Sequence, residues 1–253
     1  MVYETVTLAE MNRILFDVEE IDAKGMTICR GTRADHLRDV LKVEPGQAVK
    51  IGVVDGSIGT GTVGSVDADG VTVHCVFDAH PPPPPRIDLL LALPRPKVLK
   101  RLWAPLASLG VGRIILTNAE KVERNYFDTH WLMPEFYRPL LVEGLQQAGD
   151  THLPKVTICR RLRPFIADEL PRMFPDGLRL VADPDGEQRI AAIDVQMGQR
   201  VLVAVGPEGG WIPFELDMFK AAGFRAVRLG SRILRTDIAC IALLAMVQEQ
   251  MDA

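Results

Sequence analysis

Two short glycine-containing segments near the C-terminus have the residue types of a ligand site. The first, residues 206–210 (GPEGG), follows the continuous apolar run Val201–Val205. Such a run is typical of a strand buried on both faces of a parallel sheet, and the glycines permit backbone approaches that a Cβ would forbid. The second segment begins at Gly230, directly after the short run Arg225–Leu229, and two arginines follow within five residues. Because open α/β sheets bind ligands beside the carboxyl ends of their strands, the two segments predict a ligand crevice.

The elements that would position these residues alternate along the chain after residue 85. Apolar runs are separated by segments with helical spacing, which is typical of a parallel sheet with helices on both faces. The expected strands are Ile87–Leu93, Arg113–Thr117, Lys155–Cys159, Leu178–Ala182, Val201–Val205 and Arg225–Leu229. The expected helices are Val98–Leu109, Met133–Ala148, Phe165–Leu170, Pro213–Gly223 and Asp237–Gln250. The last helix is apolar nearly all round, so it must be buried within the fold or against a second subunit.

The first eighty residues have a different pattern. Short β-type segments are separated by turn sequences such as Asp55-Gly56, and one helix is expected at Asp35–Leu41. Several short strands with one helix predict a small barrel. Five consecutive prolines, Pro81–Pro85, cannot join the interior of a sheet and predict a semi-rigid spacer between two domains. The expected strands of the barrel are Arg13–Phe16, Met26–Arg30, Ala48–Val53, Gly59–Val66 and Val71–Phe77.

The composition is that of a globular protein, with 47% hydrophobic and 25% charged residues. The net charge is −4, and residues 1–80 carry 7 Lys and Arg against 13 Asp and Glu, so a nucleic-acid surface would have to be a local cluster of cations. The four cysteines lack CxxC spacing and form no ligand pattern with the histidines, which favours buried thiols over disulfides or a metal site. The sequence has no stretch of membrane-spanning length and no signal-peptide pattern at its start, so we expect a cytoplasmic protein.

A family resemblance is carried by VGPEGGW at residues 205–211 and LGSRILRTDIA at residues 229–239. These segments resemble the RsmE family of 16S rRNA methyltransferases, which belongs to the SPOUT (knotted) superfamily. The likeness continues in LPRPKVLKRLW at 93–103, in EGLQQAGDTHLPKV at 143–156 and in DHLRDVLKV at 35–43. It implies a PUA-like β-barrel RNA-binding domain at residues 1–80, the polyproline linker at 81–85 and a SPOUT methyltransferase domain at 86–253. In that fold the final helix threads the loop near residues 206–211.

The resemblance also implies the reaction, methyl transfer from S-adenosylmethionine to N3 of a uridine in 16S rRNA. Backbone groups at strand ends can read the edges of adenine and ribose while apolar side chains enclose the ring. A Walker-type phosphate loop is the rival interpretation, but the required Lys and Ser or Thr are absent. Glu208 either orients the cofactor or serves as a turn carboxylate near the following helix. The expected cofactor-binding residues are Val205, Gly206, Pro207, Glu208, Gly209, Gly210, Leu229, Gly230, Ile233 and Leu234.

Methylation at N3 requires that an imide proton leave, or that the developing anion be stabilised across the flanking carbonyl oxygens. Arginine suits this role because its charge persists and its fork can meet two oxygens. Arg232 and Arg235 adjoin the cofactor wall and are the expected catalytic residues, with Asp237 as a base or orienting group. The usual family ending has Glu and Thr where this chain has Asp237 and Ile238, and many members have an arginine near Asp150. No metal is needed for this chemistry.

The remaining expectations concern partners. Phosphates of RNA would be held on one face of the barrel, and relatives in this family are homodimers through the C-terminal domain. The small ribosomal subunit is therefore the expected substrate and a second copy of the chain the expected partner. Two alternatives stay open: a methyltransferase acting on tRNA or 23S rRNA, and a catalytically inactive RNA-binding assembly factor. The expected RNA-binding residues are Arg13, Arg30, Arg33, Arg38 and Lys42.

Overall fold

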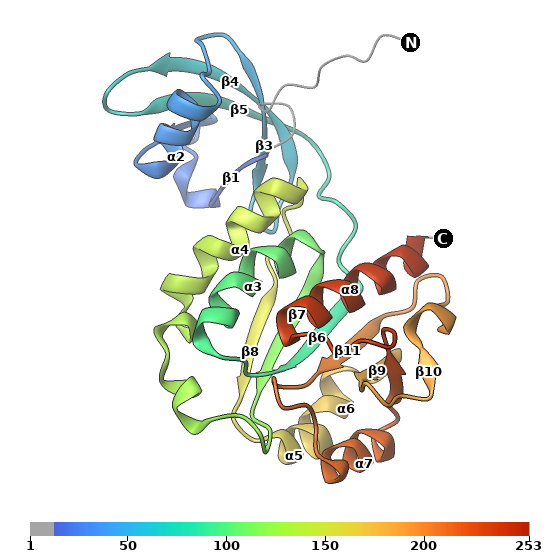
Figure 1. Ribbon diagram of the computed structural model, residues 1–253. Coiled ribbons are helices and arrows are strands. Elements are labelled where there is room, and N and C mark those ends of the chain that lie inside the picture. Colours follow the sequence, from blue (N-terminus) through green and yellow to red (C-terminus); the bar gives the residue numbers. More distant parts are fainter. Residues whose placement is uncertain (1–12, 253) are drawn as a thin grey trace. The chain divides into compact units, whose positions relative to one another are not determined.

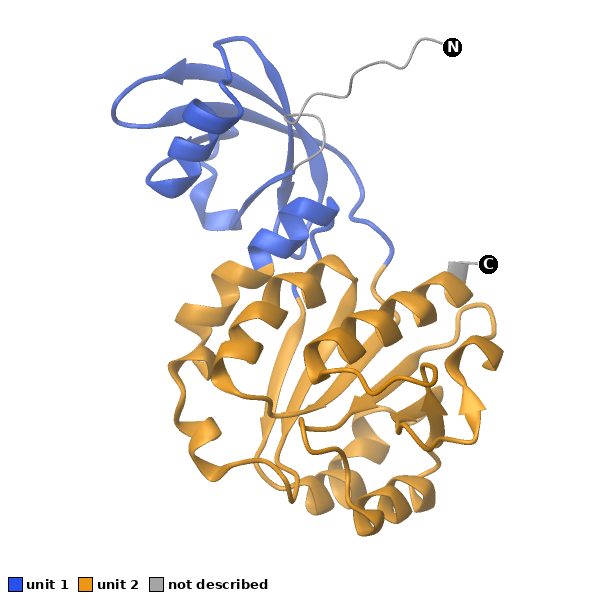
Figure 2. Cartoon of the chain, viewed as in Figure 1, with its two compact units in different colours: residues 1–83, 142–153 blue, residues 84–141, 154–253 orange. Residues whose placement is uncertain are grey.

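The structure, a computed structural model, describes residues 13–252 and divides into two compact units. One unit comprises residues up to 83 together with residues 142–153, and the other comprises residues 84–141 and 154–253 (Figure 2). The first boundary between the units, between Pro83 and Pro84, falls within the polyproline stretch at which a boundary was expected. The return of residues 142–153 to the first unit was not foreseen. Residues 1–12 of the predicted N-terminal domain lie outside the described residues.

The first unit contains a curled five-stranded sheet with the strand order β1-β3-β4-β5-β2 (Figure 1). The β1–β3 pair is parallel and the other pairs are antiparallel. Within the described chain β1 and β2 stand at the two edges, so the sheet is a half-barrel. The five strands are β1 Ile14–Phe16, β2 Met26–Cys29, β3 Ala48–Val53, β4 Ile58–Val66 and β5 Val71–Ala79.

The alternation that predicted these strands also decides which side chains enter the core of the unit. Along β5, Val71, Val73 and Cys75 are buried, whereas His74 and Val76, on either side of Cys75, point to solvent. The expected helix at Asp35–Leu41 is a short α2 at Thr32–Asp35 followed by a π-helical turn at His36–Val40. This segment covers the sheet with Ala34 and Leu37, which belong to the same hydrophobic cluster as the strands.

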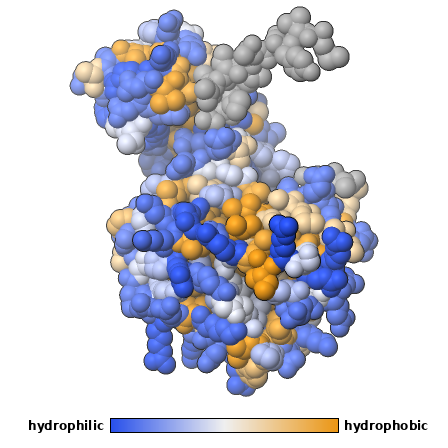
Figure 3. Space-filling view, in the orientation of Figure 1, coloured by the Kyte–Doolittle hydropathy of each residue, from blue (hydrophilic) through white to orange (hydrophobic). Residues whose placement is uncertain are grey.

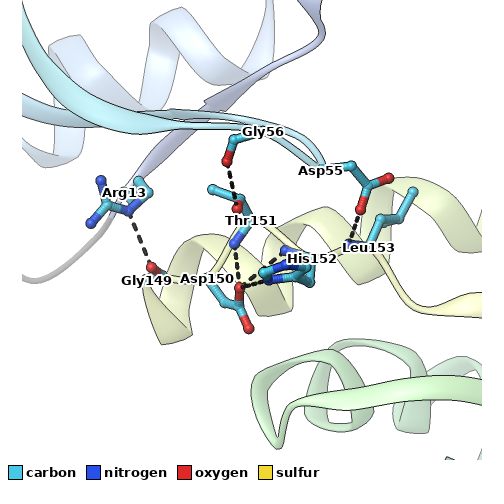
Figure 4. A network of polar contacts seen from close by, with 8 residues as sticks. All are labelled: Arg13, Asp55, Gly56, Gly149, Asp150, Thr151, His152 and Leu153. Carbon is cyan, nitrogen blue, oxygen red and sulfur yellow. Dashed lines mark hydrogen bonds and ion pairs between the residues drawn. The ribbon is translucent and has the colours of Figure 1, made fainter. Parts of the chain in front are cut away.

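Residues 142–153 complete the first unit through backbone and side-chain hydrogen bonds (Figure 4). Arg13 donates from Nε to the carbonyl of Gly149 at 3.1 Å and from Nη1 to the carbonyl of Ile51 at 2.7 Å. Thr151 is fully buried and its Oγ1 donates to the carbonyl of Gly56 at 2.9 Å. The carboxylate of Asp150 accepts from the backbone N–H groups of Thr151 and His152. Asp150 therefore holds the turn after α4 in shape.

The second unit is built on a seven-stranded sheet with the order β10-β12-β9-β11-β6-β7-β8, in which every pair is parallel. All residues of the central strands β6 and β11 are buried, including Asp88 of β6. The continuous apolar run of β11 predicted its burial. The short edge strand β10 was not foreseen, because two polar residues give no periodic signal. The strands are β6 Ile87–Ala92, β7 Val111–Thr117, β8 Lys155–Cys159, β9 Leu178–Ala182, β10 Gln188–Arg189, β11 Val201–Val205 and β12 Arg225–Arg228.

Four of the five expected helices begin and end within three residues of the expected positions. The expected helix Phe165–Leu170 is instead a π-helical turn at Phe165–Glu169, which joins two short α-helices on either side. In Figure 1, α3 and α8 lie on the near side of the sheet and α5 and α6 lie behind it. Within the described chain no helix is long and apolar enough to cross a membrane, and no group of three or more His, Cys, Asp or Glu could hold a metal ion. The helices are α3 Pro96–Ser108, α4 Pro134–Ala148 (whose last turns belong to the first unit), α5 Leu162–Pro164, α6 Leu170–Met173, α7 Pro213–Ala221 and α8 Thr236–Asp252.

The closing helix α8 has one face in the core and one in solvent. Leu243, Leu244 and Val247 are buried and pack toward β6 and β11. On the opposite face Ile238 and Ile241 are 49% and 39% exposed. Figure 3 shows hydrophobic side chains gathered over this helix. The apolar composition of α8 is thus only half explained by burial within its own chain.

Candidate functional site

A cavity of about 430 Å³ opens at the carboxyl ends of β9, β11 and β12. This is the edge at which ligands of open parallel sheets bind. The loop 205–210 that follows β11 lines one wall, residues 229–234 after β12 line another, and Thr236, Ala239 and Leu243 of α8 also line it. All ten residues expected to bind a cofactor line this single cavity, together with Arg232. The two glycine segments, more than twenty residues apart in sequence, therefore meet at one site.

Backbone conformation explains the glycines of the first segment. Gly210 has a φ of +70°, in the left-handed region that side-chain-bearing residues rarely adopt. At Gly206 an added Cβ would lie 3.2 Å from Nε1 of Trp211, whose ring packs edge-on against Phe219 at 4.8 Å. Trp211 is 8% exposed and anchors the loop. Gly206 thus allows the loop to lie directly against the indole ring of Trp211, which is held by its packing against Phe219.

The sequence did not single out the acidic part of this cavity. Asp183 and Asp185, which follow β9, line it beside Arg228 at the end of β12. The guanidinium of Arg228 donates to the carbonyls of Gly186 and Glu187 and so fixes the 183–187 loop. The available signal was the position of Asp183 and Asp185 directly after a buried parallel strand, the same criterion that identified the glycine segments.

A second cavity, of about 740 Å³, adjoins the first and shares Glu208 and Thr236 with it. It is lined by three cations, Arg95, Lys97 and Arg235, and by the carboxylate of Asp237. Glu208 links the loop after β11 to the loop after β6, since its Oε1 accepts from the backbone N–H of Arg95 at 3.1 Å. This contact joins Glu208 to another loop and not to its own turn or to the following helix, and its position between the cavities leaves a ligand contact open.

Asp237 holds two arginines at the rim of this second cavity. Its Oδ2 accepts from Nη2 of Arg235 at 2.7 Å and from Nη2 of Arg101 at 3.0 Å. Burial raises the pKa of this carboxyl, but hydrogen bonds from Arg235 and the N–H of Ile238, with the charges of Arg235 and Arg101, outweigh burial and lower it below its usual value. A carboxylate with a lowered pKa is a weak base, so the geometry favours the orienting role.

Tyr126 forms the aromatic wall of the second cavity. It is 8% exposed, and its hydroxyl donates to Oε1 of Glu123 at 2.8 Å. Burial and the Glu123 carboxylate raise the pKa of Tyr126, while the neighbouring Arg95 opposes the rise. The phenol therefore stays protonated and keeps its hydrogen bond at neutral pH. Neither Tyr126 nor Arg95 was among the expected site residues, because their significance depends on the fold.

The three expected catalytic residues do not form one cluster. Arg235 and Asp237 are bonded to each other in the second cavity, whereas Arg232 lines the first. All three lie within six residues of the chain, but the backbone turns between them. Their catalytic roles stay predictions, with Arg235 the better placed arginine for a substrate in the second cavity.

The expected RNA-binding residues divide into two groups in the first unit. Arg13 donates to the backbone carbonyls of Gly149 and Ile51, Arg33 pairs with Glu20 and lies over the Phe16 ring, and Arg38 pairs with Asp35. These three have structural contacts. Arg30 and Lys42 are exposed, and no hydrogen bond or ion pair joins either to another residue in the part of the chain described here. Whether any of the five binds RNA stays a prediction.

The fold and the site place the chain among known proteins. Residues 81–248 match the family model of the RNA methyltransferase domain, so this part of the chain is an RNA methyltransferase domain. The Treponema pallidum (strain Nichols) protein named ribosomal RNA small subunit methyltransferase E is 31% identical over 242 residues, which cover 94% of this chain and 90% of that protein. The chain belongs to this family, RsmE.

Further relatives and solved structures agree with this membership. A Borreliella burgdorferi protein, ribosomal RNA small subunit methyltransferase E 1, is 24% identical over 92% of this chain and 95% of its own length. A Legionella pneumophila methyltransferase structure with bound SAM has a TM-score of 0.76 at 22% identity, covering 94% of this chain and 97% of that one. The Neisseria gonorrhoeae methyltransferase E bound to S-adenosyl methionine gives 0.74 at 21% identity with the same coverage. These structures confirm the expected fold class.

Proposed function

We propose that this protein transfers the methyl group of S-adenosylmethionine to N3 of a specific uridine in 16S rRNA. The observation that carries the proposal is the pair of adjoining cavities, one glycine-lined and one cationic, at the carboxyl edge of the parallel sheet. Relatives named as methyltransferases of small-subunit ribosomal RNA, which match nearly the whole chain, support it. The first cavity would take the cofactor and the second the target nucleotide, with Glu208 and Thr236 at their junction.

The residues of the first cavity fit S-adenosylmethionine. Its volume of about 430 Å³ lies in the range of sites for molecules of this size. Apolar side chains of Leu229, Ile233 and Leu234 can enclose an adenine, and an added Cβ at Gly230 would meet nothing within 4 Å, so this wall has open space. The carboxylates of Asp183, Asp185 and Glu208 suit ribose hydroxyls and the positive charges of the sulfonium and amino groups.

When bound, the cofactor supplies an activated methyl group attached to sulfur. The work of the protein is then to hold the uracil in line with that methyl and to favour its anionic form. Arg95, Lys97 and Arg235 surround the second cavity, and nearby cations lower the pKa of an acid that enters it. The fork of Arg235 is held by Asp237, so it is set to donate to a uracil carbonyl oxygen without reorganising. Positioning contributes the remainder of the catalysis.

The substrate assignment is tested with methyl-labelled cofactor and 30S subunits from a bacterial strain that lacks this methylation. Label in 16S rRNA, mapped to N3 of one uridine, is the expected result. Label in tRNA or 23S rRNA, or on another atom, would contradict this assignment and identify a different substrate or position. A protein that binds 30S subunits but shows no heat of binding with S-adenosylmethionine would be an inactive assembly factor.

We also propose that the chain forms a homodimer through the apolar outer face of α8. Ile238 and Ile241 are exposed there, about one helical turn apart, and hydrophobic side chains gather over this helix (Figure 3). Ile241→Glu is expected to halve the mass measured by light scattering, whereas Glu249→Ala on the same helix should leave the mass unchanged. A wild-type protein that is monomeric at micromolar concentration contradicts the dimer. Because ribosomal subunits are its substrate, we place the enzyme in the cytoplasm.

Among the expected RNA contacts, we propose that Arg30 and Lys42 hold phosphates on the first unit. Their side chains are exposed and uncommitted within the described chain, whereas Arg13, Arg33 and Arg38 are engaged by carbonyls or carboxylates. Phosphate contacts position a protein on RNA without reading its sequence. Replacing Arg30 or Lys42 should therefore weaken binding to 30S subunits and flatten its salt dependence.

A further inference from the structure

An aromatic cluster stands on the surface of the second unit, and its residues are not part of the lining of the two cavities. His130 and Trp131 belong to a 3-10 turn, His130–Leu132, and Phe136 lies in the first turn of α4. The ring centroids of His130 and Trp131 are 4.4 Å apart, and those of His130 and Phe136 are 4.7 Å apart. Nζ of Lys100 on α3 lies 4.6 Å from the centre of the Trp131 ring. Three rings and a cation thus meet at one place.

These rings remain accessible to solvent. Phe136 is 41% exposed and the neighbouring Met133 is 49% exposed, while Trp131 is half-buried. Trp103 on α3, in contrast, is fully buried and serves the core. Exposed aromatic surface is costly in water unless a partner covers it. Nucleobases are one such partner, because each base has a flat face that stacks on aromatic side chains.

The charge of the adjoining helix favours RNA as this partner. The segment Arg95–Arg101 carries four cations, Arg95, Lys97, Lys100 and Arg101, and α3 contains no acidic residue. Cations at a helix N-terminus oppose the helix dipole, so this arrangement is unfavourable for the helix itself. An anionic partner offsets that cost. The acidic residues closest to the rings in sequence are Asp128 and Glu135, one on each side of the cluster.

The cations of α3 connect the aromatic cluster to the reaction cavities. Lys97 lines the second cavity, Arg101 bonds to Asp237 at its rim, and Lys100 lies over Trp131. Residues 97, 100 and 101 lie on the exposed side of one helix, within about one turn, or ~5.4 Å along its axis. A single strand that leaves the second cavity along this helix would reach the rings.

We propose that His130, Trp131 and Phe136 form a stacking platform for an unpaired base that neighbours the target uridine, with Lys97 and Lys100 holding the intervening phosphates. The proposal rests on the proposed function, since it extends the same RNA substrate. It gives the catalytic unit its own RNA contact, separate from the half-barrel. The platform would select target sites in which at least one flanking nucleotide is unstacked.

Steady-state methylation of 30S subunits lacking the modification tests the platform in the full-length protein. Trp131→Ala, Phe136→Ala and Lys100→Ala are each expected to raise KM for 30S subunits, by roughly 5- to 150-fold for a lost stacking contact. Affinity for S-adenosylmethionine, measured by calorimetry, should not change. Trp131→Phe keeps an aromatic face and should recover most of the affinity. Phe214→Ala, which removes a ring 60% exposed on α7, is the matched control and should have no effect.

A second measurement follows intrinsic fluorescence while a short single-stranded RNA is added. Trp131 is more accessible than Trp103 and Trp211, so quenching that disappears in Trp131→Phe reports a base at the platform. Unchanged KM in Phe136→Ala and Lys100→Ala would overturn the proposal even if Trp131→Ala fails to fold. A KM effect on 30S subunits without any quenching by RNA would assign the platform to a ribosomal protein and overturn it too. Absence of methylation by the wild type would refute the proposed function. The quenching experiment would still show whether RNA binds at the platform, because it does not depend on methylation.

Discussion

Replacing Asp237 by Asn removes the charge that holds two arginines while keeping the size of the side chain. In the structure its Oδ2 accepts from Arg235 at 2.7 Å and from Arg101 at 3.0 Å. Since these contacts lower the pKa of Asp237, the carboxylate has little affinity for a proton from uracil. We expect the substitution to disturb the orientation of Arg235. We do not expect it to impair proton removal, because we do not expect Asp237 to act as the base.

The expected magnitudes follow from exposure. The side chains of Arg101 and Arg235 are 57% and 64% exposed, so each ion pair contributes only about 0.2–1 kcal/mol. An acidic residue in the first turn of α8 adds about 0.3–1 kcal/mol. Asp237→Asn should therefore lower the free energy of unfolding by about 1–2 kcal/mol and Tm by about 2–8 °C. Because the folded-state pKa is lowered, this contribution is present above the unfolded pKa and is lost as pH falls through the folded pKa.

The assay is single-turnover methylation of 30S subunits at saturating cofactor. We expect the rate constant of methyl transfer to fall about tenfold in Asp237→Asn, less than the ~10²–10³ that Arg235→Ala should cost if Arg235 stabilises the uracil anion. Asp237→Glu keeps the carboxylate, and the usual family residue at this position is Glu, so it should retain near wild-type activity. The orienting role of Asp237 is refuted if the methylation rate of Asp237→Asn falls by more than ~10³ and its pH profile changes, while Arg235→Ala remains active. That result would identify Asp237 as the base.

Four further predictions concern other parts of the chain. Gly206→Ala should lower both Tm and cofactor affinity, because its Cβ would lie 3.2 Å from Trp211, whereas Gly230→Ala meets nothing within 4 Å and should keep the wild-type Tm; thermal melts and calorimetry compare them. Arg13→Ala should destabilise the protein by about 1–3 kcal/mol in urea unfolding, since two backbone carbonyls lose a charged donor, while Arg30→Ala should change only RNA binding. Arg200→Ala removes the ion pair, 2.7 Å long, of Asp88, which is only 1% exposed. Because burial already raises the pKa of Asp88, the variant should be most stable in acid and should lose stability as pH rises through that pKa. Asp88→Asn has no carboxyl group at this position and should not show this pH dependence. Burial raises the pKa of the Cys29, Cys75 and Cys159 thiols to about 11 and also raises that of Cys240, so at pH 8 all four should react with a thiol reagent at least ~100-fold more slowly in the native than in the unfolded protein.

Periodicity predicted most of the fold because burial in this chain follows simple patterns. The strands at 48–53, 155–159, 178–182 and 201–205 begin and end where their apolar runs do. The capacity of the glycine segments to form one site was also predictable, since carboxyl ends of parallel strands share an edge. The particular cofactor and substrate came from the family resemblance, because glycines and apolar residues alone do not specify a ligand.

The second cavity was only partly predictable. Arg235 and Asp237 lie in the motif that carried the resemblance, but Arg95, Lys97 and Tyr126 come from segments about 110–140 residues earlier in the chain. Their approach depends on the neighbouring positions of β6 and β11 in the sheet and on the hydrogen bond from Arg95 to Glu208. Similarly, the role of Asp150 in its own turn depends on side-chain geometry that no spacing rule encodes.

The return of residues 142–153 to the first unit limits how this protein can be taken apart. A fragment ending in the polyproline stretch would lack the segment that contributes the buried Thr151 and accepts a hydrogen bond from Arg13. Conversely, a fragment that starts after the prolines would carry the end of α4 without the strands that it completes. The half-barrel is therefore not a portable module that could be exchanged between relatives by a single crossover. Recombination would need three junctions to preserve it, which ties the inheritance of the half-barrel to that of the methyltransferase domain.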